Sequence, residues 1–147
     1  MKNNLITAGL LLMAVLTGCT FTTTVLKQPS FTVSTDSLGM QLNKLVQCEN
    51  FNLNGAEITT NGQKETVLEI DVINGNNIPQ EDEAMYALAK KIAVQVKEDM
   101  ADTNAYNSYK VLFVTQTVHG ITTKRIERGQ VFKNEALKTS SQPARVV

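Results

Sequence analysis

The chain has 147 residues, with 14 basic and 14 acidic side chains and a formal net charge of zero at neutral pH. Proteins that bind nucleic acid carry a clearly basic domain, so this balance argues against nucleic acid as a partner. The length that follows the first eighteen residues suits one domain with its own hydrophobic core.

The N-terminus has the three parts of a secretory signal. A positive charge at Lys2 is followed by the apolar run Leu5–Leu16 and then by small residues. The apolar run is about a dozen residues long, whereas a membrane-spanning helix needs roughly 20. No polar residue interrupts Ala8–Leu16, so an amphipathic core helix is disfavoured. We therefore predict a signal peptide over residues 1–18.

The signal ends in Leu16-Thr17-Gly18-Cys19, which resembles the lipobox of bacterial lipoproteins. The resemblance covers residues 1–19 only and implies nothing about the remaining domain. It implies cleavage between Gly18 and Cys19, lipid on the Cys19 sulfur and attachment to a membrane of the cell envelope. Two or more acyl chains give stable attachment. Thr20 is not the aspartate that signals inner-membrane retention in some two-membrane bacteria, which favours the outer membrane there.

A lipidated Cys19 cannot form a disulfide, so Cys48 is left as a single thiol. Because Cys48 follows a predicted helix, we interpret it as a small buried hydrophobe. A reactive or intermolecular thiol is the alternative.

The first predicted elements follow a tether. Residues 19–35 are rich in threonine and serine and predict a flexible tether, although 31–34 favour a short strand. The segment 34–37 supplies capping residues for a helix whose apolar stripe is Leu38, Leu42, Leu45 and Val46. Gly39 weakens this prediction because glycine is a poor helix former.

Two hairpins and a second helix complete the pattern. Asn61-Gly62 between strand-like runs 51–60 and 64–73 predicts a type I′ turn, and the second run is apolar enough to lie inside a sheet. Pro79 suits the first turn of a helix, whose apolar face is Met85, Leu88, Ala89, Ile92, Ala93, Val96 and Met100. A second tight turn at His119-Gly120 joins strands at 110–114 and 121–132.

This order predicts a single α+β domain over residues 36–134, followed by a disordered tail at 135–147. We expect two helices on one face of a four- or five-stranded antiparallel sheet, in the order αββαββ. A ferredoxin-like arrangement with an extra strand would fit this order.

Candidate catalytic groups are few. His119 is the single histidine, and we interpret it as an exposed turn residue. Ser37, Ser108 and Cys48 become nucleophile candidates only if the fold brings one of them to His119. None lies in a nucleophile-elbow motif. No metal-ligand spacing or cofactor motif is present in the sequence, so we predict no catalytic, metal or cofactor residue.

Charged residues group at three places. One side of a predicted strand carries Glu65, Glu69 and Asp71, and Glu57 could lie on the neighbouring strand. Paired carboxylates of this kind could hydrolyse glycosides. We favour the simpler interpretation that they form the solvated face of the sheet. Residues 80–83 could bind a cation, but the helix dipole explains their charge. The last strand carries Lys124, Arg125, Arg128 and Lys133, which could meet anionic lipid but more simply guard a sheet edge.

Three functions remain open. We favour a lipid-anchored envelope lipoprotein that acts as a non-catalytic interaction module for another envelope protein. This function predicts an exposed apolar patch or a strand edge available for pairing. A small-ligand or cation binder would need a concave pocket on the open sheet face, where a few aromatic side chains (Tyr86, Tyr106 and Tyr109) could contribute. A carboxylate-based hydrolase, the least favoured, would need Glu69 or Asp71 in a cleft with a raised pKa.

Overall fold

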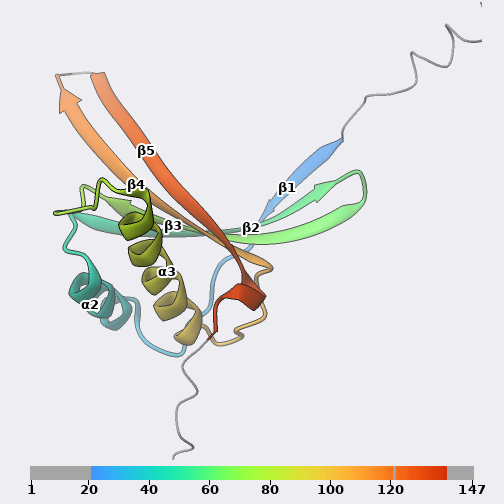
Figure 1. The fold of residues 1–147 in the computed structure, drawn as a ribbon. Coiled ribbons are helices and arrows are strands. Elements are labelled where there is room, and N and C mark those ends of the chain that lie inside the picture. The colour runs from blue at the N-terminus through green and yellow to red at the C-terminus, as the bar shows by residue number, and fades with distance from the viewer. Residues whose placement is uncertain (1–20, 121, 139–147) are drawn as a thin grey trace, which may run out of the picture.

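The computed structural model describes residues 21–120 and 122–138, so Gly18, Cys19 and residues 139–147 lie outside the described residues. Within them, two helices pack on a five-stranded mixed sheet, which confirms the α+β class (Figure 1). The elements in chain order are β1 Thr22–Leu26, α2 Thr35–Leu45, β2 Asn50–Thr60, β3 Gln63–Ile73, α3 Asp82–Glu98, β4 Ser108–His119, β5 Thr122–Lys133 and the 3₁₀ turn Asn134–Ala136.

The strands lie in the sheet in chain order, β1-β2-β3-β4-β5. Neighbours are antiparallel except β3 and β4, which are parallel from Val67 beside Ser108 to Ile73 beside Val114. The expectation of a fully antiparallel sheet is wrong at this pair, because α3 returns the chain to the starting end of β3 before β4 begins. A ferredoxin-like sheet inserts a strand between its parallel neighbours, and here they are adjacent.

Both helices cover one face of the sheet, and we call the other the helix-free face (Figure 1). The predicted stripe of the first helix is confirmed at Leu38 and Leu42, which α2 buries after an N-cap at Ser34. Leu45 is only partly buried, and Val46 is buried as the C-cap residue that follows the helix. The second helix buries a confirmed apolar face: Met85, Ala89, Ile92, Ala93 and Val96. It begins at Asp82, so Pro79 precedes the helix and does not lie in its first turn.

The predicted turn at Asn61-Gly62 is confirmed, with φ of 51° and 81° at the two residues. Positive φ at both central positions is what a type I′ turn requires. The second hairpin turns at Gly120, where φ is 59°. The two hairpins project to opposite sides of the helix-covered centre (Figure 1).

Segments expected to be irregular contribute to the fold at both ends. Within the predicted tether, Thr22–Leu26 form β1 and pair with Ala56–Thr60, as β-branched threonines favour. The strand expected at 31–34 is reduced to a single bridge between Phe31 and Met100. Leu137, in the predicted tail, is buried in the core. No helix of the described residues is both long and apolar enough to cross a membrane.

Candidate functional site

The edge of the sheet beside β2 is only half covered. β1 pairs with Ala56–Thr60, and Asn50–Leu53 have no described strand on that side. The chain leaves the edge after Lys27, whose N–H donates to the carbonyl of Gly55 at 2.8 Å. The Lys27 carbonyl then accepts the Tyr106 hydroxyl at 2.6 Å, which fixes the point of departure.

Main-chain polar groups face outward along this open half. Gly55 directs its carbonyl to β1, and residues two apart on a strand point the same way. Leu53 and Phe51 therefore direct their N–H and carbonyl groups to the uncovered side. The Phe51 N–H donates to the side chain of Asn50 at 2.9 Å, and the described residues give the outward N–H of Leu53 no partner. The open half of β2 is thus available for strand pairing.

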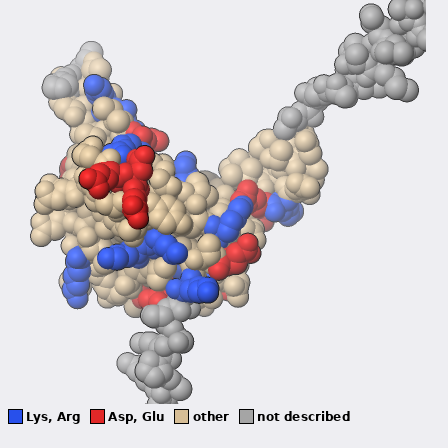
Figure 2. Space-filling model, viewed as in Figure 1, with Lys and Arg blue, Asp and Glu red and all other residues tan. Residues whose placement is uncertain are grey.

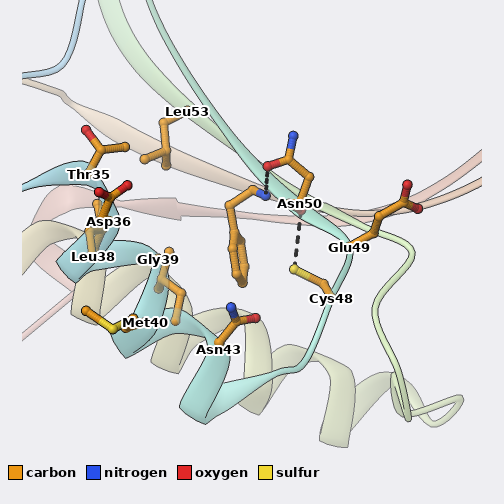
Figure 3. Close-up of a pocket in the computed structure, with 12 residues that line it drawn as sticks. Thr35, Asp36, Leu38, Gly39, Met40, Asn43, Cys48, Glu49, Asn50 and Leu53 are labelled. Carbon is orange, nitrogen blue, oxygen red and sulfur yellow. Dashed lines mark hydrogen bonds between the residues drawn. The ribbon is translucent and has the colours of Figure 1, made fainter.

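A groove of about 350 Å³ separates this open half from α2 (Figure 3). Asp36 lies at one end of the groove and Glu49 at the other (Figure 3). We call it the α2–β2 groove and define it by its lining residues: Thr35, Asp36, Leu38, Gly39, Met40, Leu42, Asn43, Cys48, Glu49, Asn50, Phe51 and Leu53. This set has two carboxylates and no basic side chain, so the groove is partly apolar and has acidic ends.

Gly39 lies in the middle of α2, where glycine destabilises a helix. A Cβ atom added at Gly39 would meet no described atom within 4 Å, so packing does not require the glycine. Its absent side chain leaves the α2–β2 groove wider.

We expect Gly39→Ala to raise the free energy of unfolding by about 0.8–1.0 kcal/mol, because alanine is the better helix former and the space is open. Urea unfolding followed by circular dichroism measures the change. Gly129→Ala is the matched control, since its Cβ would lie 2.4 Å from Leu112 Cδ2 and should destabilise the protein. A loss of stability in Gly39→Ala would show that the groove wall is packed more tightly than described.

Cys48, in the wall of the groove, is a free thiol. Its Sγ donates to the carbonyl of Asn50 at 3.3 Å (Figure 3). Partial burial raises the pKa of the Cys48 thiol. Because the thiolate is the reactive form, the raised pKa favours the structural interpretation over the reactive one.

The main chain places His119 far from Ser108, one of the predicted nucleophile candidates. His119 ends β4 at the hairpin tip, and Ser108 begins the same strand, roughly 35 Å away at the usual rise per residue. The Ser108 hydroxyl donates instead to Glu65 at 3.1 Å. Ser37 lies in the first turn of α2, where its N–H donates to Ser34, and Cys48 lines the groove.

The three carboxylates of β3 lie on the helix-free face, as predicted, and each has a basic partner. Lys110 donates to Glu69 at 2.8 Å and Lys133 to Glu65 at 2.6 Å. Glu57 stands opposite Thr66, so it faces the other side of the sheet and pairs with Lys64 at 2.8 Å. Glu57 therefore cannot join the other carboxylates.

Asp71 differs from them because it is only 4% exposed although no helix covers it. Its Oδ2 accepts from Arg125 at 3.3 Å, and its Oδ1 has no partner in the described residues. Burial raises the pKa of Asp71, and the nearby Glu69 adds to the rise, while Arg125 opposes it. The raised pKa is what the hydrolase hypothesis requires, but Glu69, the other carboxylate named in it, is held by Lys110.

We expect Asp71→Asn to gain stability relative to the wild type as the pH rises from about 4 towards neutral. The raised native pKa means that the folded wild type holds this proton more tightly, so its stability falls as the pH rises through the ordinary pKa and then the native one. Unfolding measured at a series of pH values tests this. Glu65→Gln is the control of opposite sign. Because Lys133 lowers the pKa of Glu65, the wild type should gain stability relative to that variant as the pH rises. If the free energy of unfolding varied with pH in the same way for Asp71→Asn and the wild type, this prediction would be refuted.

The acidic cluster at 80–83 and the basic strand β5 contact each other. Arg128 donates to the carbonyl of Gln80 at 3.0 Å and to Asp82 at 3.1 Å. Arg125 reaches Asp71 on the opposite face, as the predicted alternation requires. Acidic side chains gather over the start of α3 and basic ones over its later turns (Figure 2). Across 21–120 and 122–138, no group of three His, Cys, Asp or Glu residues could hold a metal ion.

Of the three tyrosines considered for a ligand site, only Tyr86 is exposed. Tyr106 and Tyr109 are fully buried, and burial raises the pKa of Tyr109 to about 12. Tyr86 is partly exposed and packs on Phe132 with ring centroids 5.1 Å apart.

Comparison with known proteins adds no relative: no family model, curated protein or solved structure matches the chain. The α2–β2 groove is the feature that the sequence did not locate. The sequence signals this groove only through Gly39, which lies within the predicted helix, and through the uncharged residues 50–53.

Proposed function

We propose that the chain is an envelope lipoprotein, anchored by lipid on Cys19, that acts as a non-catalytic interaction module and binds a protein partner in the α2–β2 groove. The observation that carries this proposal is the open half of β2, Asn50–Leu53, lying beside the groove. An uncovered strand edge next to a partly apolar groove is a recurring way to bind a polypeptide.

The position of the anchor supports the proposal. Phe21 and Asn61 bond to each other through the Phe21 N–H, 3.2 Å from Asn61 Oδ1, and the Asn61 N–H, 3.0 Å from the Phe21 carbonyl. Lipid on Cys19 would therefore hold the β2–β3 turn near the bilayer. The open half lies at the other end of β2, about 30 Å away at the rise of a strand. The groove would then be held away from the membrane surface, within reach of a partner.

We expect Cys19→Ser to lose palmitate label and to leave the membrane fraction or to accumulate as the precursor, because the sulfur that carries the lipid is absent. Fractionation and metabolic labelling of cells that produce the full chain measure both effects. Cys48→Ser is the matched control and should stay lipidated and membrane-bound. Persisting label in Cys19→Ser would refute the anchor.

Photocrosslinking in intact envelopes tests the partner site. A photoreactive residue at Met40, which is 63% exposed and lines the groove, should capture one recurrent protein. The same residue at Val131, 60% exposed on β5, is the matched control. Capture at Met40 that is absent at Val131 and lost in Cys19→Ser supports the proposal, and identical products from both positions would contradict it.

A binder of small ligands or cations is the second candidate, favoured by the unpartnered Oδ1 of Asp71 on the helix-free face. That oxygen is buried, so a ligand could reach it only after the side chains around Asp71 move. Titration of the protein with small amines, followed by Asp71→Asn as the control, distinguishes this function from the first.

A further inference from the structure

We infer, on the basis of the proposed function, that the partner binds as one extended segment that adds a strand to the sheet in line with β1. The added strand would pair with the outward main-chain groups of Leu53 and Phe51, which follow the last β1 bond from Lys27 to Gly55, and it would displace the Asn50 side chain from the Phe51 N–H. Backbone polar groups favour a hydrogen-bonded partner, and only another main chain matches their spacing along a strand.

The two faces of β2 define the pattern of side chains that the segment needs. Phe51 and Leu53 face the helices, opposite Val72 and Ile70, and line the groove. Asn50, Asn52 and Asn54 alternate with them and face the helix-free side. Side chains of adjacent strands share a face, so the segment should alternate apolar residues towards the groove with polar residues towards the asparagines.

Charge and space refine this pattern. Asp36 and Glu49 stand at the two ends of a groove that has no basic lining residue, so basic side chains at the ends of the segment complement it (Figure 3). The open space at Gly39 leaves room for an apolar side chain between them.

The same surroundings favour a single segment over a second copy of this sheet. Natural sheets guard exposed edges with lysine, proline or covering elements. The outer strand β5 carries four basic residues, Lys124, Arg125, Arg128 and Lys133, whereas Asn50–Leu53 carry no charge and no proline. A second copy paired through this same edge would bring its own Asp36 and Glu49 beside those of the first, and like charges disfavour that arrangement.

A synthetic peptide with the pattern Lys-Val-Thr-Val-Thr-Val-Lys tests the inference with the full chain in detergent. Fluorescence anisotropy of the labelled peptide gives its affinity. Two further peptides carry backbone N-methyl groups, one on the valines and one on the threonines. Strand addition predicts that one methylated peptide binds roughly tenfold or more weakly, since it loses several hydrogen bonds, while the other keeps its affinity within about threefold.

Variants of the protein locate the binding. Gly39→Leu fills the open space and should weaken the peptide roughly tenfold, whereas Gly39→Ala should change affinity by less than about threefold. Asp36→Asn together with Glu49→Gln should weaken binding and reduce its dependence on salt.

The outcomes separate this inference from the proposed function. Equal affinity of the two methylated peptides, or no binding of the parent peptide, overturns strand addition. If Met40 still captures a partner in the envelope, the proposed function stands with another mode of binding. If Met40 captures nothing and the parent peptide does not bind, both are refuted.

Discussion

Ile92→Asp is expected to remove at least about 4 kcal/mol from the free energy of unfolding, which is most of the stability of a small domain near the lower end of the usual range. Ile92 is fully buried on the face of α3 that packs on the sheet. The substitution buries a carboxylate without a partner and leaves a cavity where the isoleucine packed. Loss of the cooperative thermal transition, followed by circular dichroism, is the measurement.

Two controls on the same helix make the test specific. Lys91→Asp changes an exposed neighbour and should alter stability by less than about 0.5 kcal/mol. Leu88→Asp should give an intermediate loss, because Leu88 is only partly buried against the core. Equal melting of Ile92→Asp and Lys91→Asp would show that the packed face of α3 is wrongly assigned.

Local patterns in the sequence predict the elements of this fold well. The spacing of Leu38 and Leu42 and the longer stripe of α3 identify the buried helix faces. Asn61-Gly62 identifies both the turn and its type, because few residues tolerate positive φ in succession. Each of these features depends on residues that are close together in the sequence, so local sequence patterns are sufficient to predict it.

The arrangement of the elements depends on contacts between distant segments. Nothing near Ser108 specifies that β4 lies parallel to β3 and not beside β2, since that choice follows from where α3 packs. β1 was missed for a similar reason. A run of threonines has no apolar alternation, and it becomes a strand because the long β2 provides an edge at Ala56–Thr60.

The candidate site depends both on local sequence patterns and on contacts between distant segments. The sequence predicted that a strand edge could serve a partner, and it placed Glu69 and Asp71 on one face correctly. It could not locate the open edge, which is set by the point where β1 departs, nor the burial of Asp71 and its contact with Arg125 from across β4. Features that depend on where a strand ends, or on contacts between distant strands, are therefore the hardest to predict from sequence.

Gly55 fixes the boundary between the covered and the open half of β2. Gly55→Ala is the second substitution for which we expect a large loss of stability. A Cβ atom at Gly55 would lie 2.0 Å from the Lys27 carbonyl oxygen and 2.1 Å from the Tyr106 hydroxyl. Relief of this clash must move β1 or the buried Tyr106. We expect a loss of about 2–4 kcal/mol, the sum of overpacking and the broken Tyr106 hydrogen bond.

Urea unfolding and hydrogen exchange of the β1 amides measure this loss, and exchange should quicken in β1 before it does in β3. Tyr106→Phe supplies the control for coupling, because Gly55→Ala should cost about 1 kcal/mol less when the hydroxyl is already absent. Additive losses, or unchanged protection of β1, would mean that Gly55 does not hold the strand in place. A detached β1 would extend the open edge from Asn50–Leu53 to the whole of β2, so Gly55 sets where the open edge begins.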